Sequence, residues 1–267
     1  MAITTLDGVI AGMQYPREII KAVSGTMVAG RPFSYFYTAG QPGAAVPSTA
    51  GVAGEALTSY PGQLPFTNPV SGNTYLARFA AQTTAAGTLV LADRLWHNSG
   101  LTITSTSPQT INSVGFPPRD DLGASNGDGI IIGVEVTSTV GAGTPTLTIS
   151  YTNTNDVSGR TATNVVPTVA SSLIGTFYPI GLQAGDVGVK SVQTYTQSAT
   201  WTSGSVCLVA YRILARLTQS AANTPVAIDA LTGGFVRLHD NTVPFFIIKP
   251  AATTSSTVSG HVIWTQG

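Results

Sequence analysis

The residues from 207 to 217 constrain the fold more than any other stretch of the sequence. Alternate positions from Cys207 onward are apolar, whereas the intervening set begins apolar and turns basic at Arg212 and Arg216. Because side chains alternate between the faces of a strand, this pattern predicts a long strand covered on both sides at its start and on one side at its end. A helix is the alternative, since the two arginines are four residues apart and Leu, Ala and Arg favour helices.

Residues 186–197 form a second strand-like run just before this one. Their apolar side chains are interleaved with Thr and Gln, and the offset between Val189 and Val192 predicts a bulge or a bend at Ser191. A cluster of small turn residues, TSGS at 202–205, separates the two runs. Because such clusters connect paired strands, we expect the two runs to form a hairpin at the centre of a β protein.

Most of the chain after residue 73 repeats one rhythm, in which short apolar runs are separated by Gly, Pro, Asn and Ser. Helical runs of about 10 to 15 residues do not alternate with them, so the pattern predicts an antiparallel sandwich or barrel. We therefore expect an all-β fold, an antiparallel, jelly-roll-like β-sandwich over residues 73–267. The other strands are expected at residues 74–80, 88–97, 101–112, 129–140, 145–153, 163–169, 172–180, 225–230, 235–239, 243–249 and 257–264.

Residues 1–72 differ in composition and predict an extended N-terminal arm. Pro16 favours one or two helical turns after it, and residues 26–37 have the alternation of a strand with an aromatic cluster that is typical of a core. Residues 38–73 are rich in Gly, Pro, Ala and Ser, leave room for a short helix at 54–60, and are long for a loop in a compact domain. Their apolar side chains indicate an arm lying on a surface, its own or a neighbour's. The residues expected at a subunit interface are Tyr15, Phe33, Tyr35, Phe36, Tyr37, Leu57, Tyr60, Leu64 and Phe66.

The composition of the chain indicates the kind of environment in which the protein functions. The 267 residues carry zero net charge, and only 9% of them are charged. Long-range attraction to nucleic acid or to an anionic membrane is therefore not expected, and so few charges favour a protein that lives in an assembly. The single cysteine, Cys207, is expected in the core, and neither a signal peptide nor a membrane span is apparent, which predicts folding in the cytosol.

The motifs that could carry chemistry are weak. Ser125 lies in a G-x-S-x-G match, but within a turn-rich loop rather than at a strand-to-helix turn. The acidic residues of that loop, at 120–128, suggest calcium, yet their spacing does not match a calcium-binding loop. His97, His239 and His261 are isolated, and no phosphate-binding loop or dinucleotide fingerprint occurs. The sequence therefore predicts no catalytic, metal or cofactor site, and no enzyme. The adjacent pairs Asp93/Arg94 and Arg119/Asp120 are expected to be local ion pairs or turn contacts.

Several blocks of the sequence resemble a known family. They are DRLWHNSGL at 93–101, QTIN at 109–112, PPRD at 117–120, NGDG at 126–129, SYTN at 150–153, GRTAT at 159–163, LQAGDVGVKSVQ at 182–193, and residues 260–267. In this order they look like virion structural proteins of tailed bacteriophages and prophages, over roughly residue 92 to the C-terminus. The family offers no catalytic residue to carry over.

The resemblance implies a setting rather than a site. A β-sandwich with an N-terminal arm is similar to capsid decoration, or cement, proteins, which sit as trimers on the outside of the shell. The implied partners are the major capsid protein and further copies of this chain, with no nucleic acid, membrane or small-molecule substrate, and the implied location is the capsid surface after synthesis in the bacterial cytoplasm. The alternatives are a neck or tail component, and a fibre-tip domain that binds host glycans through Trp96, Trp201 or the loop at 120–128.

Overall fold

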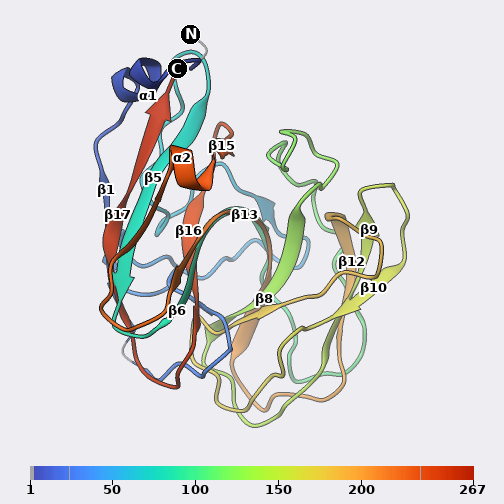
Figure 1. The fold of residues 1–267 in the computed structure, drawn as a ribbon. Helices are drawn as coiled ribbons and strands as arrows, with labels where there is room; N and C mark the ends of the chain where they lie inside the picture. Colours follow the sequence, from blue (N-terminus) through green and yellow to red (C-terminus); the bar gives the residue numbers. More distant parts are fainter. Residues whose placement is uncertain (1–2, 24, 235) are drawn as a thin grey trace.

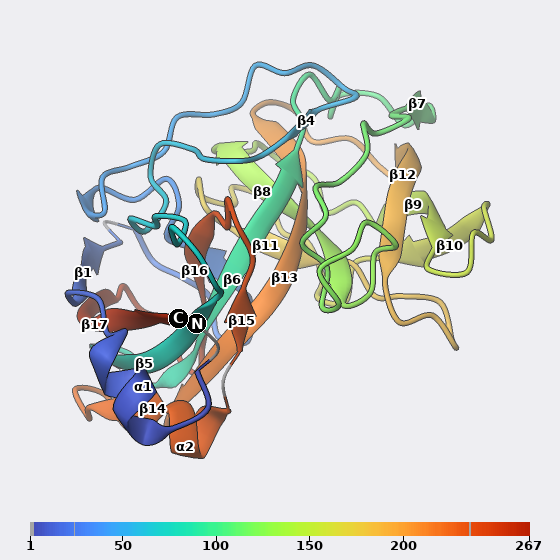
Figure 2. The ribbon, with the colours of Figure 1, turned by 90° about the horizontal axis from the view of Figure 1, so that it is seen from above.

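The computed structural model describes residues 3–23, 25–234 and 236–267. These residues form three antiparallel sheets, and two of them flank the third on opposite sides (Figures 1 and 2). The prediction of an all-β, antiparallel sandwich is therefore confirmed. Helices in the described part are short, α1 (Leu6–Ala11) and α2 (Ala230–Gly233), and none is long and apolar enough to cross a membrane.

The central sheet rolls up on itself. Its strand order is β11-β8-β13-β6-β16-β2, with β4 also paired to β6. The two ends of this order meet, because the Ser34 amide donates to the Gly175 carbonyl and the Phe177 amide donates to the Pro32 carbonyl. The sheet is thus a closed, six-stranded antiparallel barrel. The bounds are β2 (Phe33–Ser34), β4 (Glu55–Ala56), β6 (Gly87–His97), β8 (Ile130–Ser138), β11 (Phe177–Pro179), β13 (Ser205–Gln219) and β16 (Pro244–Pro250).

Strand β13 is the long strand that the alternation predicts, and it spans 15 residues. Its first half is buried on both sides, because one face points into the barrel and the other packs on a flanking sheet. Towards its end Arg216 and Thr218 are exposed, as the basic positions indicate. Arg212 departs from this pattern, since it is only 3% exposed.

One flanking sheet covers the barrel on the side of β6 and β16. Its order is β14-β5-β17-β1-β3, with β15 also paired to β5. Phe79 and Trp264 from this sheet are buried against Leu91 and Phe246 of the barrel. Burying side chains of this size contributes about 2 to 3 kcal/mol each. The bounds are β1 (Arg17–Ala22), β3 (Gly40–Gln41), β5 (Thr74–Thr83), β14 (Val226–Asp229), β15 (Arg237–Leu238) and β17 (Thr257–Gln266).

The other flanking sheet covers the barrel on the side of β8. Its order is β10-β9-β12-β7, and its Tyr151 and Tyr195 are buried against Val134 and Leu208 of the barrel. The register of β12 on β9 shifts between Val189 and Ser191, so the bulge predicted there is confirmed. The bounds are β7 (Gln109–Thr110), β9 (Leu147–Asn153), β10 (Arg160–Thr163) and β12 (Val189–Gln197).

The predicted hairpin between residues 186–197 and 207–217 is wrong. Strand β12 pairs with β9 and β7, whereas β13 pairs with β6 and β8, so the two strands belong to different sheets. The connection between them crosses from the flanking sheet to the barrel. Trp201 anchors this crossing, because it is fully buried and its amide donates to the Ile103 carbonyl. The turn residues at 202–205 therefore indicate that the chain changes direction there, but they do not indicate that the strands on either side pair with each other.

Two predicted helices are also wrong. Residues 17–22 form β1, which pairs along its whole length with β17, and the alternate burial of Ile19 and Lys21 fits a strand. Residues 54–60 contain β4, which pairs with β6 (Figure 2). In both places tertiary pairing overrides a weak local preference for helix. Three predicted strands are much shorter than expected, since β2, β7 and β11 replace 26–37, 101–112 and 172–180. The strand predicted at 163–169 is wrong, because β10 ends at its first residue. In the strand expected at 235–239, residue 235 lies outside the described residues.

The described residues before 73 lie against the rest of the chain. They supply β1, β2, β3 and β4 to two of the sheets. Lys21 binds the following segment to the body, because its buried ammonium group donates to the Tyr35, Thr38 and Gly43 carbonyls. Burial lowers the pKa of Lys21 to about 8. The division into an arm of residues 1–72 and a sandwich of 73–267 stays a prediction.

Candidate functional site

The lumen of the central barrel gathers side chains that a search for short motifs does not connect. Alternate residues of each strand point inward, as Cys207, Val209 and Tyr211 do on β13. The rings of Phe177, Phe245 and Tyr211 fill the middle of the lumen. The centroid of the Tyr211 ring lies 5.2 Å from that of Phe177 and 6.3 Å from that of Phe245. The lumen therefore has two separate ends.

One end of the lumen is closed by an ion pair that is fully buried. An Arg94 Nη1 atom lies 2.5 Å from Glu135 Oε2, and both side chains are 0% exposed. The guanidinium carbon is 4.4 Å from the centroid of the Phe36 ring. Burial acts to lower the pKa of Arg94, but the charge of Glu135, the hydrogen bond to it and the nearby Tyr37 and Cys207 together outweigh burial, so the pKa is raised. The pair closes the barrel without leaving a lone charge in its interior.

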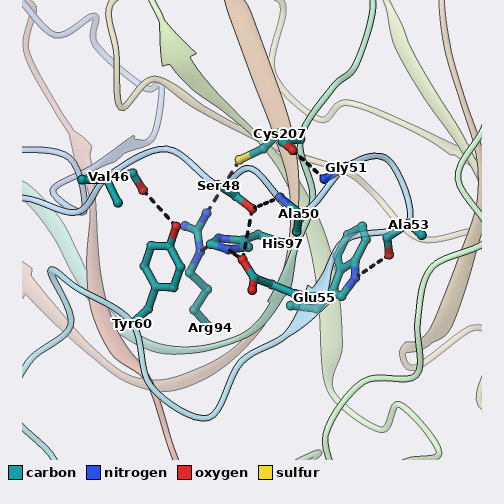
Figure 3. Close-up of polar contacts among 12 residues, drawn as sticks. Val46, Ser48, Ala50, Gly51, Ala53, Glu55, Tyr60, Arg94, His97 and Cys207 are labelled. Carbon is teal, nitrogen blue, oxygen red and sulfur yellow. Dashed lines mark hydrogen bonds and ion pairs between the residues drawn. The ribbon is translucent and has the colours of Figure 1, made fainter.

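His97 connects this cluster to Glu55, whose side chain is 44% exposed (Figure 3). Arg94 Nε donates to His97 Nδ1 at 3.2 Å, so the ring proton lies on Nε2, which donates to Glu55 Oε1 at 3.0 Å. The Tyr60 ring stands edge-on to the imidazole, with centroids 4.6 Å apart. Burial, and next the positive charge of Arg94, lower the pKa of His97 to about 2. His97 is therefore neutral near neutral pH.

Residues 48–57, which we call the strap, seal this closed end. The strap is tied to the end of β6, because Trp96 Nε1 donates to the Ala53 carbonyl at 3.0 Å and the Leu57 amide donates to the Leu95 carbonyl at 2.8 Å. Inside the strap, Ser48 donates to Glu55 at 3.2 Å. These contacts hold the Glu55 carboxylate where it accepts from His97.

Cys207 lies within the closed end, as the sequence predicts for a core cysteine. Its Sγ atom is 3.7 Å from an Arg94 nitrogen and 3.9 Å from Glu135. Burial raises the pKa of the thiol to about 12. A thiol with that pKa carries almost no thiolate near neutral pH, so Cys207 is a weak nucleophile in the folded chain.

The other end of the lumen is an open cup of about 480 Å³. Residues from β6, β8, β11, β13 and β16 line it, together with Pro32 just before β2. Its inner surface is apolar, with Ile131 and Ile213 half-buried, and its rim carries Arg216 and Lys249. No local sequence pattern indicates this cup, because its lining residues are far apart along the chain.

Neither adjacent charged pair forms a local ion pair, whereas Asp120 makes the turn contacts that were the alternative expectation. Asp93 pairs with Arg119 through two hydrogen bonds of 2.9 and 3.1 Å, and Arg94 pairs with Glu135. Neighbouring residues on a strand point to opposite faces, so Asp93 and Arg94 lie on different sides of β6. Because residues 88–97 are predicted to form a strand, the alternation of side chains along it already indicates that Asp93 and Arg94 cannot pair with each other.

The loop at 120–128 is organised by one carboxylate. Asp120 accepts hydrogen bonds from the amides of Leu122, Ala124, Asn126 and Gly127, at 2.7 to 3.1 Å. Both carboxylate oxygens of Asp120 therefore accept hydrogen bonds from backbone amides of the loop. Among the described residues no group of three or more His, Cys, Asp or Glu side chains is placed to hold a metal ion.

The other motifs fall in structural positions. The exposed Ser125 lies in this loop, which leads into β8 and not into a helix. Both tryptophans proposed as glycan platforms, Trp96 and Trp201, are 0% exposed. A glycan site built on those two rings is therefore wrong, since a sugar must stack on an accessible ring.

The nine residues predicted at a subunit interface differ in exposure. Tyr15 is 86% exposed. The others are packed within this chain: Phe33, Tyr35, Phe36, Leu57 and Leu64 are buried, and Tyr37, Tyr60 and Phe66 are half-buried. The interface role of the set stays a prediction, and Tyr15 is the member that presents a free surface.

Comparisons with known proteins add little. No protein-family model matches the chain, and no curated protein sequence matches it. A weak structural match is the VP2 subviral particle of infectious bursal disease virus, with a TM-score of 0.22 and 8% identity over 96% of this chain and 81% of that chain. Structures of the Gt and Gx strains of the same virus match with TM-scores of 0.20 and 0.21, at 11% and 8% identity, over 95% of this chain and 82% of theirs. Similarity this low carries no argument about function.

Proposed function

We propose that this chain is a non-enzymatic structural protein of a tailed-phage virion, and more specifically a capsid decoration protein that bridges neighbouring subunits. The sequence blocks that resemble phage virion proteins support this setting. The zero net charge and the 9% of charged residues favour a protein that is covered by neighbours. The charged groups inside the barrel support a structural role, since Arg94 and Glu135 are fully buried and paired with each other.

The observation that carries the proposal is an apolar surface at the N-terminus. Leu6 is 63% exposed, Ile10 57%, Met13 45% and Tyr15 86%. We call these four residues the N-terminal surface. It is held against the body, because Thr265 Oγ1 donates to the Val9 carbonyl at 2.8 Å. Apolar side chains gathered on one fixed segment are typical of a contact with another protein.

The strand next to this surface has an open edge. β1 pairs with β17 from Arg17 to Ala22, but with β3 only at Ile20 and Lys21. Among the described residues the outer edge of Arg17–Ile19 therefore has no strand partner. An open edge can add a strand from a neighbouring chain, which gives affinity through backbone hydrogen bonds.

In this proposal the contact works by repetition. Each apolar contact contributes about 25 cal/mol per Å² buried, from which the entropy cost of association is subtracted. A symmetric shell repeats the contact many times, so that individually weak contacts add up to a strong clamp. A trimer of this chain would present three N-terminal surfaces at once.

The test replaces the surface without touching the core. A variant with Leu6→Ser, Ile10→Ser and Tyr15→Ser is expected to fold normally and to be lost from purified particles. The matched control is Leu122→Ser, Val165→Ser and Val187→Ser, which are 75%, 65% and 62% exposed elsewhere on the molecule. Quantitative mass spectrometry of particles measures the copy number of each variant against the main shell protein. Wild-type occupancy of the first variant would refute the proposed contact.

The same measurement separates the related roles. A copy number close to that of the shell protein supports decoration of the capsid lattice. A small fraction of that number supports the alternative, a neck or tail component. Absence of the wild-type chain from particles would refute a virion role altogether.

A further inference from the structure

The cup at the open end of the barrel has the features of a ligand site. The ring of strands fixes its shape before any ligand arrives, and the mouths of β-barrels are frequent binding sites. Its volume of about 480 Å³ falls within the range of small-molecule pockets. Phe177 and Tyr211 lie towards the filled middle of the lumen, and Val90, Ile131 and Ile213 line the sides.

The rim of the cup is positively charged. Arg216 on β13 stands opposite Val90 of β6, and Lys249 on β16 stands opposite Thr88 of the same strand, so the two cations lie on either side of β6. Both are exposed, and neither forms an ion pair with a described residue. The Thr88 and Thr218 hydroxyls lie 3.4 Å apart at the same rim. An anion at the mouth would therefore meet two unpaired cations and two hydroxyls.

We propose that the cup binds an amphipathic carboxylate, with its aliphatic chain against Val90, Ile131 and Ile213 and its carboxylate between Arg216 and Lys249. The apolar wall favours the chain through burial, and Arg and Lys donate charge-assisted hydrogen bonds to the carboxylate. Medium-chain fatty acids have this chemistry.

The closed barrel favours such a ligand over a peptide. Among the described residues, backbone pairing runs from β11 through to β2, and the Ser34–Gly175 and Phe177–Pro32 hydrogen bonds join the two ends, so most of the barrel wall has no open edge for an added strand. A peptide inserted there would bury its own amides without partners, which is costly. An aliphatic chain carries no such groups.

The test is titration calorimetry on the intact chain with decanoate below its micelle concentration. Decanol and decyltrimethylammonium, which share the aliphatic chain but are neutral or cationic, are titrated alongside. The charge-reversal variant is Arg216→Glu with Lys249→Glu. Its matched control is Arg78→Glu with Arg237→Glu, two exposed residues outside the cup that give the same change in net charge. Thermal melts establish that each variant is folded.

Decanoate is expected to bind more tightly than either analogue, and charge reversal is expected to weaken it about tenfold or more while the control is unchanged. Ile213→Trp, which fills the cup, is expected to abolish binding. Absence of decanoate binding, equal binding of decanol, or insensitivity to charge reversal would each overturn the proposal. So would a dimer in sedimentation that Ile213→Trp disrupts and decanoate does not, because the cup would then belong to a second copy. The readout is independent of particle assembly, so it does not depend on the proposed virion role.

Discussion

Acidification is expected to destabilise this protein through His97. In the folded state Nδ1 accepts from Arg94 and Nε2–H donates to Glu55. A second proton has to enter at Nδ1, where it would remove the first hydrogen bond and face a guanidinium charge. Burial and then Arg94 accordingly lower the pKa of His97 to about 2. Tyr60 covers the ring, and the partly exposed Glu55 is too weak a counter-charge to reverse the effect.

The size of the effect follows from linkage. An unfolded histidine has a pKa of about 6.5, so between about pH 6.5 and pH 2 the unfolded chain binds one more proton at this site than the folded chain. Stability therefore falls as the pH falls, by about 1.4 kcal/mol per pH unit. From pH 7 to pH 4.5 the loss is about 2.6 kcal/mol, a substantial part of the 5 to 15 kcal/mol typical of a domain.

The assay is urea unfolding followed by tryptophan fluorescence at about pH 7 and about pH 4.5. His97→Gln is expected to be less stable at pH 7, but to lose about 2.6 kcal/mol less than the wild type on acidification. His261→Gln, on the half-exposed strand β17, serves as the control and is expected to lose as much as the wild type. Burial also lowers the pKa of His239, and all three proteins retain that contribution. An equal loss in His97→Gln and the wild type would refute this reasoning.

Three further perturbations follow from the barrel. Arg94→Met is expected to cost about 3 to 5 kcal/mol in urea unfolding, because it strands Glu135, and adding Glu135→Leu is expected to restore part of the loss; a cost below about 1 kcal/mol would contradict this. Gly133→Ala places a Cβ 2.2 Å from Phe177 Cζ and is expected to cost about 1 to 3 kcal/mol, whereas Gly115→Ala, with nothing within 4 Å, is expected to be near neutral; equal stabilities would contradict the packing. Cys207 is expected to resist a thiol reagent such as DTNB in the folded protein, since burial raises its pKa to about 12. After unfolding it is expected to react with one equivalent of the reagent, and rapid labelling of the folded chain would contradict its burial.

Local patterns in the sequence were sufficient to predict that the fold is all-β and to predict part of its core. The alternation from Cys207 to Leu217 predicts β13, and the offset before Ser191 predicts the bulge in β12. In the aromatic cluster at 33–37, Phe33, Tyr35 and Phe36 are buried as predicted. These features could be predicted because the period of side-chain orientation along a strand is a property of the strand itself.

Partners across sheets could not be predicted in this way. The turn at 202–205 looks like a hairpin, yet it carries the chain from one sheet to another around the buried Trp201. Residues 17–22 look helical after Pro16, yet they form a strand because β17 is there to pair with them. Sequence periodicity states which way side chains point, and it does not state which strand lies alongside.

What the sequence by itself determined, then, is an antiparallel all-β chain of low charge, with Cys207 and the aromatic residues around Phe36 in its core. Only the tertiary structure decided that the central sheet closes between Ser34 and Gly175, that Arg94 meets Glu135, and that one end of the lumen is sealed while the other is a cup. The physical reason is that barrel closure depends on strand tilt and register summed over the whole ring, and this sum exists only when every strand is in place.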